Sequence, residues 1–113
     1  MFLVSNVQNN VMHGVRADYS SSGVKICEWN FVHGQVHGKV TDYYDKKGSI
    51  KLLSDYQHDK LHGKVEKFTI KGIKEYKESY DKGIKHGVFK TYDSKGKVDS
   101  EQRYHYGQFV EQQ

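Results

Sequence analysis

The chain has 113 residues, of which 35% are apolar and 13% are aromatic, including nine Tyr, five Phe and one Trp. An apolar share below the usual ~45–50% argues against a thick core, while interspersed charges and recurring aromatic residues argue against disorder. The net charge of +4 is compatible with an acidic partner, although no run of five like charges occurs, and the single Cys27 excludes an internal disulfide framework.

The sequence opens with a short apolar segment, residues 2–7. This segment is too short for a signal peptide and lacks a positive flank, and no later segment is apolar enough to span a membrane, so we expect a cytoplasmic protein. The segment also carries no charge that would block edge pairing. It is predicted to be an edge strand that either frays or adds to a partner, and addition to a second copy would give a homodimer.

Five series of residues recur along the rest of the sequence. His-Gly pairs occur at steps of 24, 25 and 24 residues, with their histidines at His13, His37, His62 and His86. An aromatic residue stands six positions after each of them: Tyr19, Tyr43, Phe68 and Tyr92. Another stands six positions before the next histidine position: Phe31, Tyr56, Tyr80 and Tyr104. Glycines mark the middle of each unit and the junctions between units, at Gly23, Gly48, Gly72 and Gly96, and at Gly34, Gly83 and Gly107.

The glycine-marked turns leave runs of about seven to nine residues, which is strand length, so each unit is predicted to be a β-hairpin. The expected fold class is therefore all-β, a single-layer antiparallel meander of hairpin repeats in one open, twisted, solenoid-like sheet. The chain 1–113 forms one domain with a cap, four repeats and a tail, at 1–12, 13–36, 37–61, 62–85, 86–109 and 110–113.

Turn chemistry predicts the loops between the strands. The segments that end at Gly96 and at Gly83 both have the pattern of a three-residue loop, a type I turn followed by glycine in the left-handed region. Asp59 stands where a junction glycine is expected, and Asp tolerates the same region. The second unit has one extra residue, so we expect a longer, four-residue loop after Tyr44.

These loops imply a register between neighbouring strands. Counting outward from them places His86 opposite Tyr104, and Gly72 opposite Tyr92. In this register all repeat aromatics share one face. Each ring is expected to cover a glycine of the neighbouring strand, because only a residue without a Cβ leaves room for it.

The same residues carry a resemblance. An aromatic, a short linker, His-Gly, four residues, a second aromatic and a turn glycine run from Tyr56 to Gly72 and again from Tyr80 to Gly96. On this pattern, residues 7–109 resemble the MORN repeat family, and in particular its bacterial antitoxin-like variant. The resemblance implies a β-hairpin repeat sheet that binds proteins, attaches to acidic lipid head groups or neutralises a toxin. It implies no catalytic residue.

The sequence contains residue types that could in principle bind a metal or act in catalysis, among them seven histidines and Cys27. Neighbouring repeat histidines should lie two strands apart, about 9–10 Å, too far to share one zinc ion, so we expect them to pack on the opposing aromatics. His33, His58 and His105 fall in turns, where exposure is expected. Cys27 lies on a predicted strand whose side chains alternate between the two faces, and we expect it to be a small packing residue. Without a phosphate loop or a paired acid and base, the sequence predicts no enzyme, no cofactor and no metal site.

The predicted function is protein binding by an adaptor or inhibitor that covers the surface of its partner with the aromatic face. Tyr and Trp are enriched where interface energy concentrates. The expected partner-binding residues are Trp29, Phe31, Tyr43, Tyr56, Tyr76, Tyr80, Tyr92, Lys39, Lys64 and Lys90. Lysines among the rings keep a second hypothesis open, in which the Lys/Tyr face binds an acidic surface of lipid head groups or nucleic acid.

Overall fold

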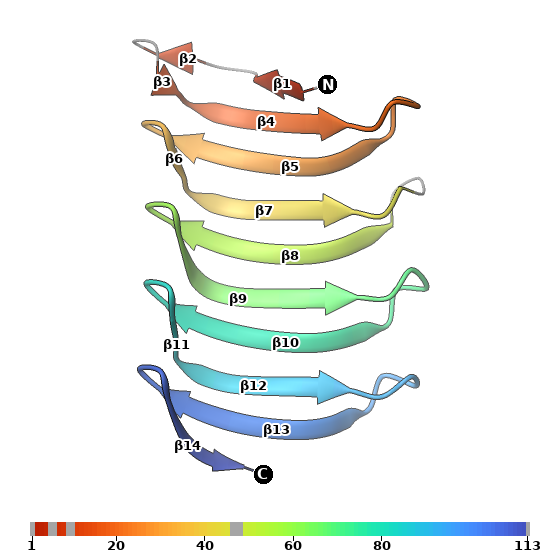
Figure 1. Ribbon diagram of the computed structural model, residues 1–113, viewed down its shortest axis with the longest axis vertical. Helices are drawn as coiled ribbons and strands as arrows, with labels where there is room; N and C mark the ends of the chain where they lie inside the picture. Colours follow the sequence, from red (N-terminus) through yellow and green to blue (C-terminus); the bar gives the residue numbers. More distant parts are fainter. Residues whose placement is uncertain (1, 5–6, 9–10, 46–48, 113) are drawn as a thin grey trace.

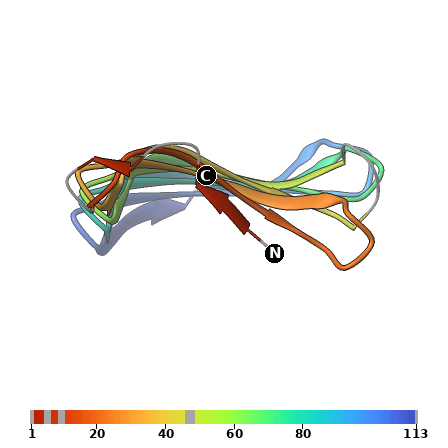
Figure 2. The ribbon, with the colours of Figure 1, turned by 90° about the horizontal axis from the view of Figure 1, so that it is seen from above.

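Strands succeed one another across a single sheet in their sequence order (Figure 1). The structure, a computed structural model, describes residues 2–4, 7–8, 11–45 and 49–112. Within these residues the regular elements are strands, and no helix is present that could cross a membrane. The chain measures 47 × 31 × 13 Å, and Figure 2 shows one thin, bent layer. The predicted all-β, single-layer antiparallel meander is confirmed.

The path across the sheet runs through strands that pair antiparallel with their neighbours. These strands are β1 (Phe2–Val4), β4 (Gly14–Tyr19), β5 (Lys25–Val32), β7 (Gly38–Tyr43), β8 (Ile50–Gln57), β9 (Lys60–Phe68), β10 (Lys74–Asp81), β12 (Gly87–Tyr92), β13 (Val98–His105) and β14 (Gln108–Gln112). Beside this path, β6 (Gln35–Val36) pairs with β5 and β11 (Ile84–Lys85) pairs with β10, while β2 (Val7–Gln8) and β3 (Val11–Met12) pair with each other. The homodimer expected through segment 2–7 stays a prediction, and residues 5–6 of that segment lie outside the described ranges.

The central turns of the first, third and fourth repeats have the predicted form. In the fourth repeat the Gly96 N–H donates to the Asp93 carbonyl at 2.9 Å, and the Asp93 N–H donates to the Lys97 carbonyl at 2.8 Å. Gly96 adopts a φ of 84°, the left-handed region expected of it. In the second repeat the Tyr44 N–H reaches the carbonyl of Ser49, one residue further along, so the longer loop is confirmed; its residues 46–48 lie outside the described ranges.

The junction turns correct the prediction of three-residue loops. Asp81 pairs directly with Ile84, so the loop holds only Lys82 and Gly83, with φ values of 51° and 87°. Two successive left-handed residues make a type I′ turn, whose twist matches that of the flanking strands. The same form recurs at His33-Gly34, His58-Asp59 and Tyr106-Gly107. The φ of 66° at Asp59 confirms that Asp adopts the glycine conformation there.

A bulge next to each central turn corrects the predicted register. Tyr92 pairs with Val98 as expected, but Thr91 pairs with Ser100, so Asp99 is an extra residue in the second strand. The shift places Gly87 opposite Tyr104, where His86 was expected. The equivalent extra residues in the first three repeats are Ile26, Lys51 and Glu75. The prediction that the repeat histidines oppose the second aromatic series is therefore wrong by one residue.

This one-residue shift separates the two aromatic series. Side chains alternate between faces along a strand, and directly paired residues share a face. The aromatic face, as we define it, carries Trp29, Phe31, Tyr56, Tyr76, Tyr80, Phe89 and Tyr104. The opposite lysine face carries Tyr19, Tyr43, Phe68 and Tyr92 with Lys39, Lys64 and Lys90. The prediction of a single face for all rings is wrong, although each series keeps to one side throughout.

The glycines serve backbone conformation, so the prediction that rings cover them is also corrected. A Cβ added at Gly72 would meet nothing within 4 Å, which means that no ring lies over this position. At Gly87, with a φ of +111°, an added Cβ would lie 3.0 Å from the Ser79 hydroxyl oxygen. The glycine of each His-Gly pair thus allows a backbone with positive φ, and Gly63 and Gly87 also allow a close approach to the neighbouring strand.

Burial is shallow because the described sheet has no second layer. The residues below a tenth exposed are Ala17, Cys27, Phe31, Val40, Ser54 and Val65. Most other strand residues are half-buried under their neighbours on the same face. Stability therefore comes from contacts between adjacent strands and accumulates from repeat to repeat.

Replacing Gly87 by Ala should destabilise the sheet more than replacing Gly72 by Ala. Both positions have a positive φ, which costs an L-residue about 1–2 kcal/mol. Only Gly87 adds a steric conflict, with Ser79, so we expect the free energy of unfolding to fall by about 3 kcal/mol for Gly87→Ala. Urea unfolding of both variants measures the difference. Equal losses would contradict the close approach at Gly87.

Candidate functional site

Aromatic rings contact one another across the strands of the aromatic face. Ring centroids lie 5.6 Å apart between Tyr80 and Phe89, 4.8 Å between Phe89 and Tyr104, and 5.8 Å between Tyr104 and Phe109, each pair in edge-on geometry. Such contacts stabilise aromatic pairs beyond the burial of their area. The result is a connected row of rings from β10 to β14. In the first repeat, Trp29 and Phe31 stack at 6.5 Å.

Sequence reasoning missed Phe89, which links this row. It stands three positions after its repeat histidine, where the second and third repeats have the buried residues Val40 and Val65. The signal was present in the sequence as an apolar residue recurring at this position. Phe89 was missed because the expected face was assigned only from the aromatic residues that stand six positions from a repeat histidine.

Hydrogen bonds hold several of these rings in place, and the tyrosine hydroxyls of the aromatic face stay protonated and neutral. The Tyr80 hydroxyl donates to Glu78 at 2.9 Å, and burial together with this bond raises the pKa of Tyr80 to about 12. Burial also raises the pKa of Tyr76. The Trp29 indole N–H donates to Asp18 at 3.2 Å. At neutral pH the face therefore presents neutral donors and apolar ring edges, the combination that interface tyrosines supply.

Cys27 lies on the aromatic face between Asp18 and Asp42, its direct partners on the two neighbouring strands. It is buried, and burial, reinforced by a hydrogen bond with Asp42, raises the pKa of the thiol to about 12. Because the thiolate is the reactive form, this cysteine is a weak nucleophile at neutral pH. Cys27 is therefore placed as a packing residue, as its position on an alternating strand predicted.

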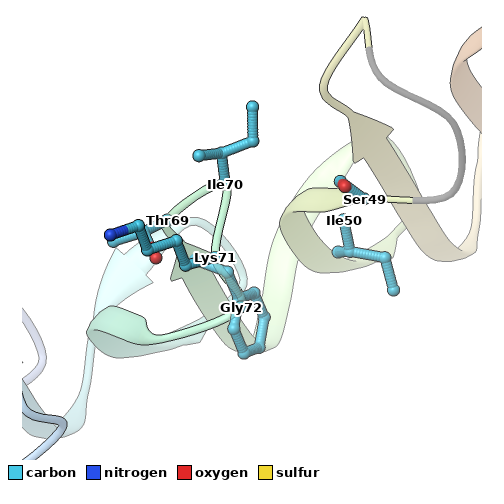
Figure 3. A pocket seen from close by; sticks show the side chains of 7 residues that line it. Ser49, Ile50, Thr69, Ile70, Lys71 and Gly72 are labelled. Carbon is cyan, nitrogen blue, oxygen red and sulfur yellow. The ribbon is translucent and has the colours of Figure 1, made fainter.

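The hollows of the described surface are shallow and differ in character. On the aromatic face, Glu78, Phe89, Gln102 and Tyr104 contribute to a hollow of about 220 Å³. Between two central turns lies a hollow of about 360 Å³, shown in Figure 3, whose lining includes Ile50 and Ile70. The second hollow is lined by apolar and hydroxyl side chains with one lysine, and it adjoins residues outside the described ranges.

The lysines expected among the rings lie on the lysine face, and several of them pair with carboxylates. Lys39 lies 3.1 Å from Asp55, and Lys90 lies 3.6 Å from Glu101, in both cases directly across the ladder. Lys25 and Lys74 pair with Glu28 and Glu66 at 2.8 and 2.7 Å. Exposed pairs of this kind contribute little to stability, but they reduce the positive field of the face.

The ten expected binding residues therefore fall into two groups. The aromatic face holds Trp29, Phe31, Tyr56, Tyr76 and Tyr80. The lysine face holds Tyr43, Tyr92, Lys39, Lys64 and Lys90. One flat partner can contact only one of these groups at a time, because the sheet itself separates them.

The repeat histidines correct another expectation, since they contact the next junction turn and not the opposing aromatic. His62 Nδ1 accepts the N–H of Lys82 at 3.1 Å. His86 Nδ1 accepts the N–H of Tyr106 at 3.2 Å, and these two rings stack at 4.2 Å. The type I′ turns, which are shorter than predicted, bring the first turn residue within reach of the histidine that begins the same repeat. The described residues hold no group of three or more His, Cys, Asp or Glu side chains placed to bind a metal.

No protein-family model matches this sequence, and no curated protein sequence matches it either. The inference of function therefore begins from the two faces and the groups that they carry.

Cys27 should react slowly with thiol reagents in the folded protein. With a pKa of about 12, almost none of the thiol is ionised at pH 8, so we expect a rate at least about 100-fold below that of the unfolded chain. Stopped-flow measurement with a disulfide reagent, with and without urea, gives the ratio. Similar rates in both conditions would show that the thiol is neither buried nor raised in pKa.

Proposed function

We propose that this protein is a non-catalytic binding module that covers the surface of a protein partner with its aromatic face, in the manner of an antitoxin, inhibitor or adaptor. The observation that carries the proposal is the connected row of half-buried rings on a sheet without a second layer. Tyr, Trp and Phe are enriched at the cores of protein interfaces, where partially exposed rings become fully buried. The cytoplasmic location expected from the sequence belongs to this proposal.

The size of the sheet supports a protein partner. A stable interface of standard size covers about 800 Å² on each partner. A face with extents of 47 × 31 Å offers more than this area, and no strand or helix within the described ranges covers it. A folded partner with an apolar patch of ordinary size therefore fits on the aromatic face.

Rigidity of the rings supports the same proposal. Neighbouring rings hold Phe89 and Tyr104, while Glu78 fixes Tyr80 and Asp18 fixes Trp29. Side chains that are already ordered lose little conformational entropy on binding, so more of the contact energy appears as affinity. The neutral hydroxyl of Tyr80 can also be buried at low cost compared with a charge.

A second candidate function, binding of an acidic surface of lipid head groups or nucleic acid, rests on the lysine face. Burial and the nearby charges of Lys64, Lys74 and Lys90 lower the pKa of Lys77. These ammonium groups repel one another, and an anionic partner would reduce that repulsion. The carboxylates paired with Lys39, Lys74 and Lys90 weaken this field, so the aromatic face remains our first choice.

Removing rings from the aromatic face should abolish partner binding, whereas removing rings from the lysine face should not. The test uses two double variants. The aromatic-face variant combines Tyr76→Ser and Tyr80→Ser, and the matched lysine-face control combines Tyr43→Ser and Tyr92→Ser. All four rings are half-buried, so the variants lose comparable packing. Interface hot spots cost 2 kcal/mol or more, so recovery of the partner should fall by at least about 30-fold for the first variant only.

The measurement is affinity capture from native lysate with quantitative mass spectrometry, at low and high salt, with circular dichroism to show that both variants are folded. Salt-resistant capture of one protein by the wild type and the control, but not by the aromatic-face variant, is the expected result. Equal capture by both variants would reject the aromatic face as the binding surface.

The acidic-surface candidate makes a different prediction. If phosphate contacts dominate, affinity for vesicles containing anionic lipid, or for single-stranded DNA, should fall steeply between about 50 and 200 mM salt. Replacing Lys64 and Lys77 by Gln should weaken this binding, and the aromatic-face variant should leave it unchanged. Co-sedimentation and fluorescence anisotropy measure the two ligands. Absence of binding at 50 mM salt would exclude the candidate.

A further inference from the structure

The junction turns gather histidines along one side of the sheet, the left side in Figure 1. In the first two repeats, the repeat histidine lies next to a second histidine, which stands in the junction turn at the end of the same repeat. The centroid of the His13 ring lies 5.6 Å from that of His33, and the centroid of the His37 ring lies 5.4 Å from that of His58. We call these the two junction pairs. His33 and His58 are both exposed, so each pair is open to solvent.

These separations match those of two imidazoles bound to one metal ion. Zinc binds imidazole nitrogen at about 2.0–2.1 Å with tetrahedral angles, which places the two ring centroids about 5 Å apart. The neighbouring repeat histidines were expected to be too far apart to share an ion. That distance does not apply here, because the second ring comes from a junction turn and not from another repeat histidine.

The hydrogen bonds of the second junction pair leave a ring nitrogen available. His58 Nδ1 lies 3.0 Å from the side-chain oxygen of Gln35. Since an amide oxygen only accepts, Nδ1 carries the proton and the lone pair of His58 is on Nε2. Metal-binding histidines are commonly oriented in this way, by donating their other N–H to an oxygen. The His37 ring makes no hydrogen bond within the described residues.

The backbone around this pair is already fixed. The Asp59 carboxylate accepts the N–H of Val36 at 2.7 Å, and the Asp59 N–H donates to the Val36 carbonyl at 3.0 Å. These bonds hold the turn that carries His58 against the residue before His37. In the first junction pair, His13 Nδ1 is buried and has no hydrogen-bond partner among the described residues, so it is a polar atom still to be satisfied.

The other repeat histidines differ and act as internal controls. His62 and His86 accept backbone N–H groups through Nδ1, so their ring protons are on Nε2 and no lone pair remains for a metal. His62 faces Lys82 and Asp81 in place of a second imidazole. His86 lies 5.2 Å from His105, yet its Nδ1 is already occupied by the N–H of Tyr106.

We propose that the two junction pairs each bind one imidazole-preferring divalent ion, with Zn²⁺ as the representative, through one nitrogen from each ring. Imidazole suits zinc, copper and nickel, and water would complete the coordination of an ion held by two protein ligands. Each ion would connect the histidine that begins a repeat to the junction turn that ends the same repeat. These two sites do not depend on the aromatic face, so they are tested separately from the proposed function.

Isothermal titration of the full chain with zinc chloride at pH 7.5 tests the proposal. The wild type should bind two ions. His58→Asn and His33→Asn should each bind one, a twofold loss in stoichiometry, and Asn is well tolerated at the first position of a type I′ turn. The matched control His105→Gln removes an equally close histidine and should still bind two ions. Binding of fewer than two ions by the wild type, or equal loss in the control, would overturn the proposal.

Imidazole ¹⁵N chemical shifts of the wild type give a second readout that needs no variant to fold. On addition of zinc chloride, signals of His13, His33, His37 and His58 should shift. Those of His62 and His86 should stay in place. Shifts confined to His62 and His86, or no shifts at all, would contradict the assignment of the ligands.

Discussion

One extra residue in the second strand of each hairpin determines which side chains share a face. Ile26, Lys51, Glu75 and Asp99 each form a bulge beside a central turn, and the ladder beyond them is displaced by one position. Because side chains alternate along a strand, a displacement of one residue moves every later side chain to the other face. The two aromatic series are thereby separated, one with Phe89 and Tyr104 and the other with the lysines.

The separation gives a thin sheet two surfaces of different chemistry. On one side, ring contacts and neutral hydroxyls make a broad surface that suits a protein partner. On the other, lysines alternate with the carboxylates that they pair with. The junction turns form a third region, in which the histidine that begins a repeat contacts the turn that ends the same repeat. A fold with so little buried volume places most of its residues on one of these surfaces.

Much of this fold follows from the sequence, because the His-Gly period and the turn glycines leave strand-length segments between them. The form of the central turns and the longer loop after Tyr44 also follow, since turn chemistry is local. The bulges could not be predicted, because Ile26, Lys51, Glu75 and Asp99 share no residue type. The glycine at Gly83 fits a two-residue loop as well as a three-residue loop, so the histidine contacts and the split of the expected binding residues were missed.

Nuclear Overhauser contacts between side-chain protons test the bulged register most directly. The register predicts contacts of Phe89 with both Tyr80 and Tyr104, which lie on one face with centroids 5.6 and 4.8 Å away. It predicts none between Val88 and Tyr104, because Val88 pairs with Arg103 and lies on the opposite face. A contact between Val88 and Tyr104, with Phe89 separated from Tyr104, would contradict the bulge and the division of the surface that depends on it.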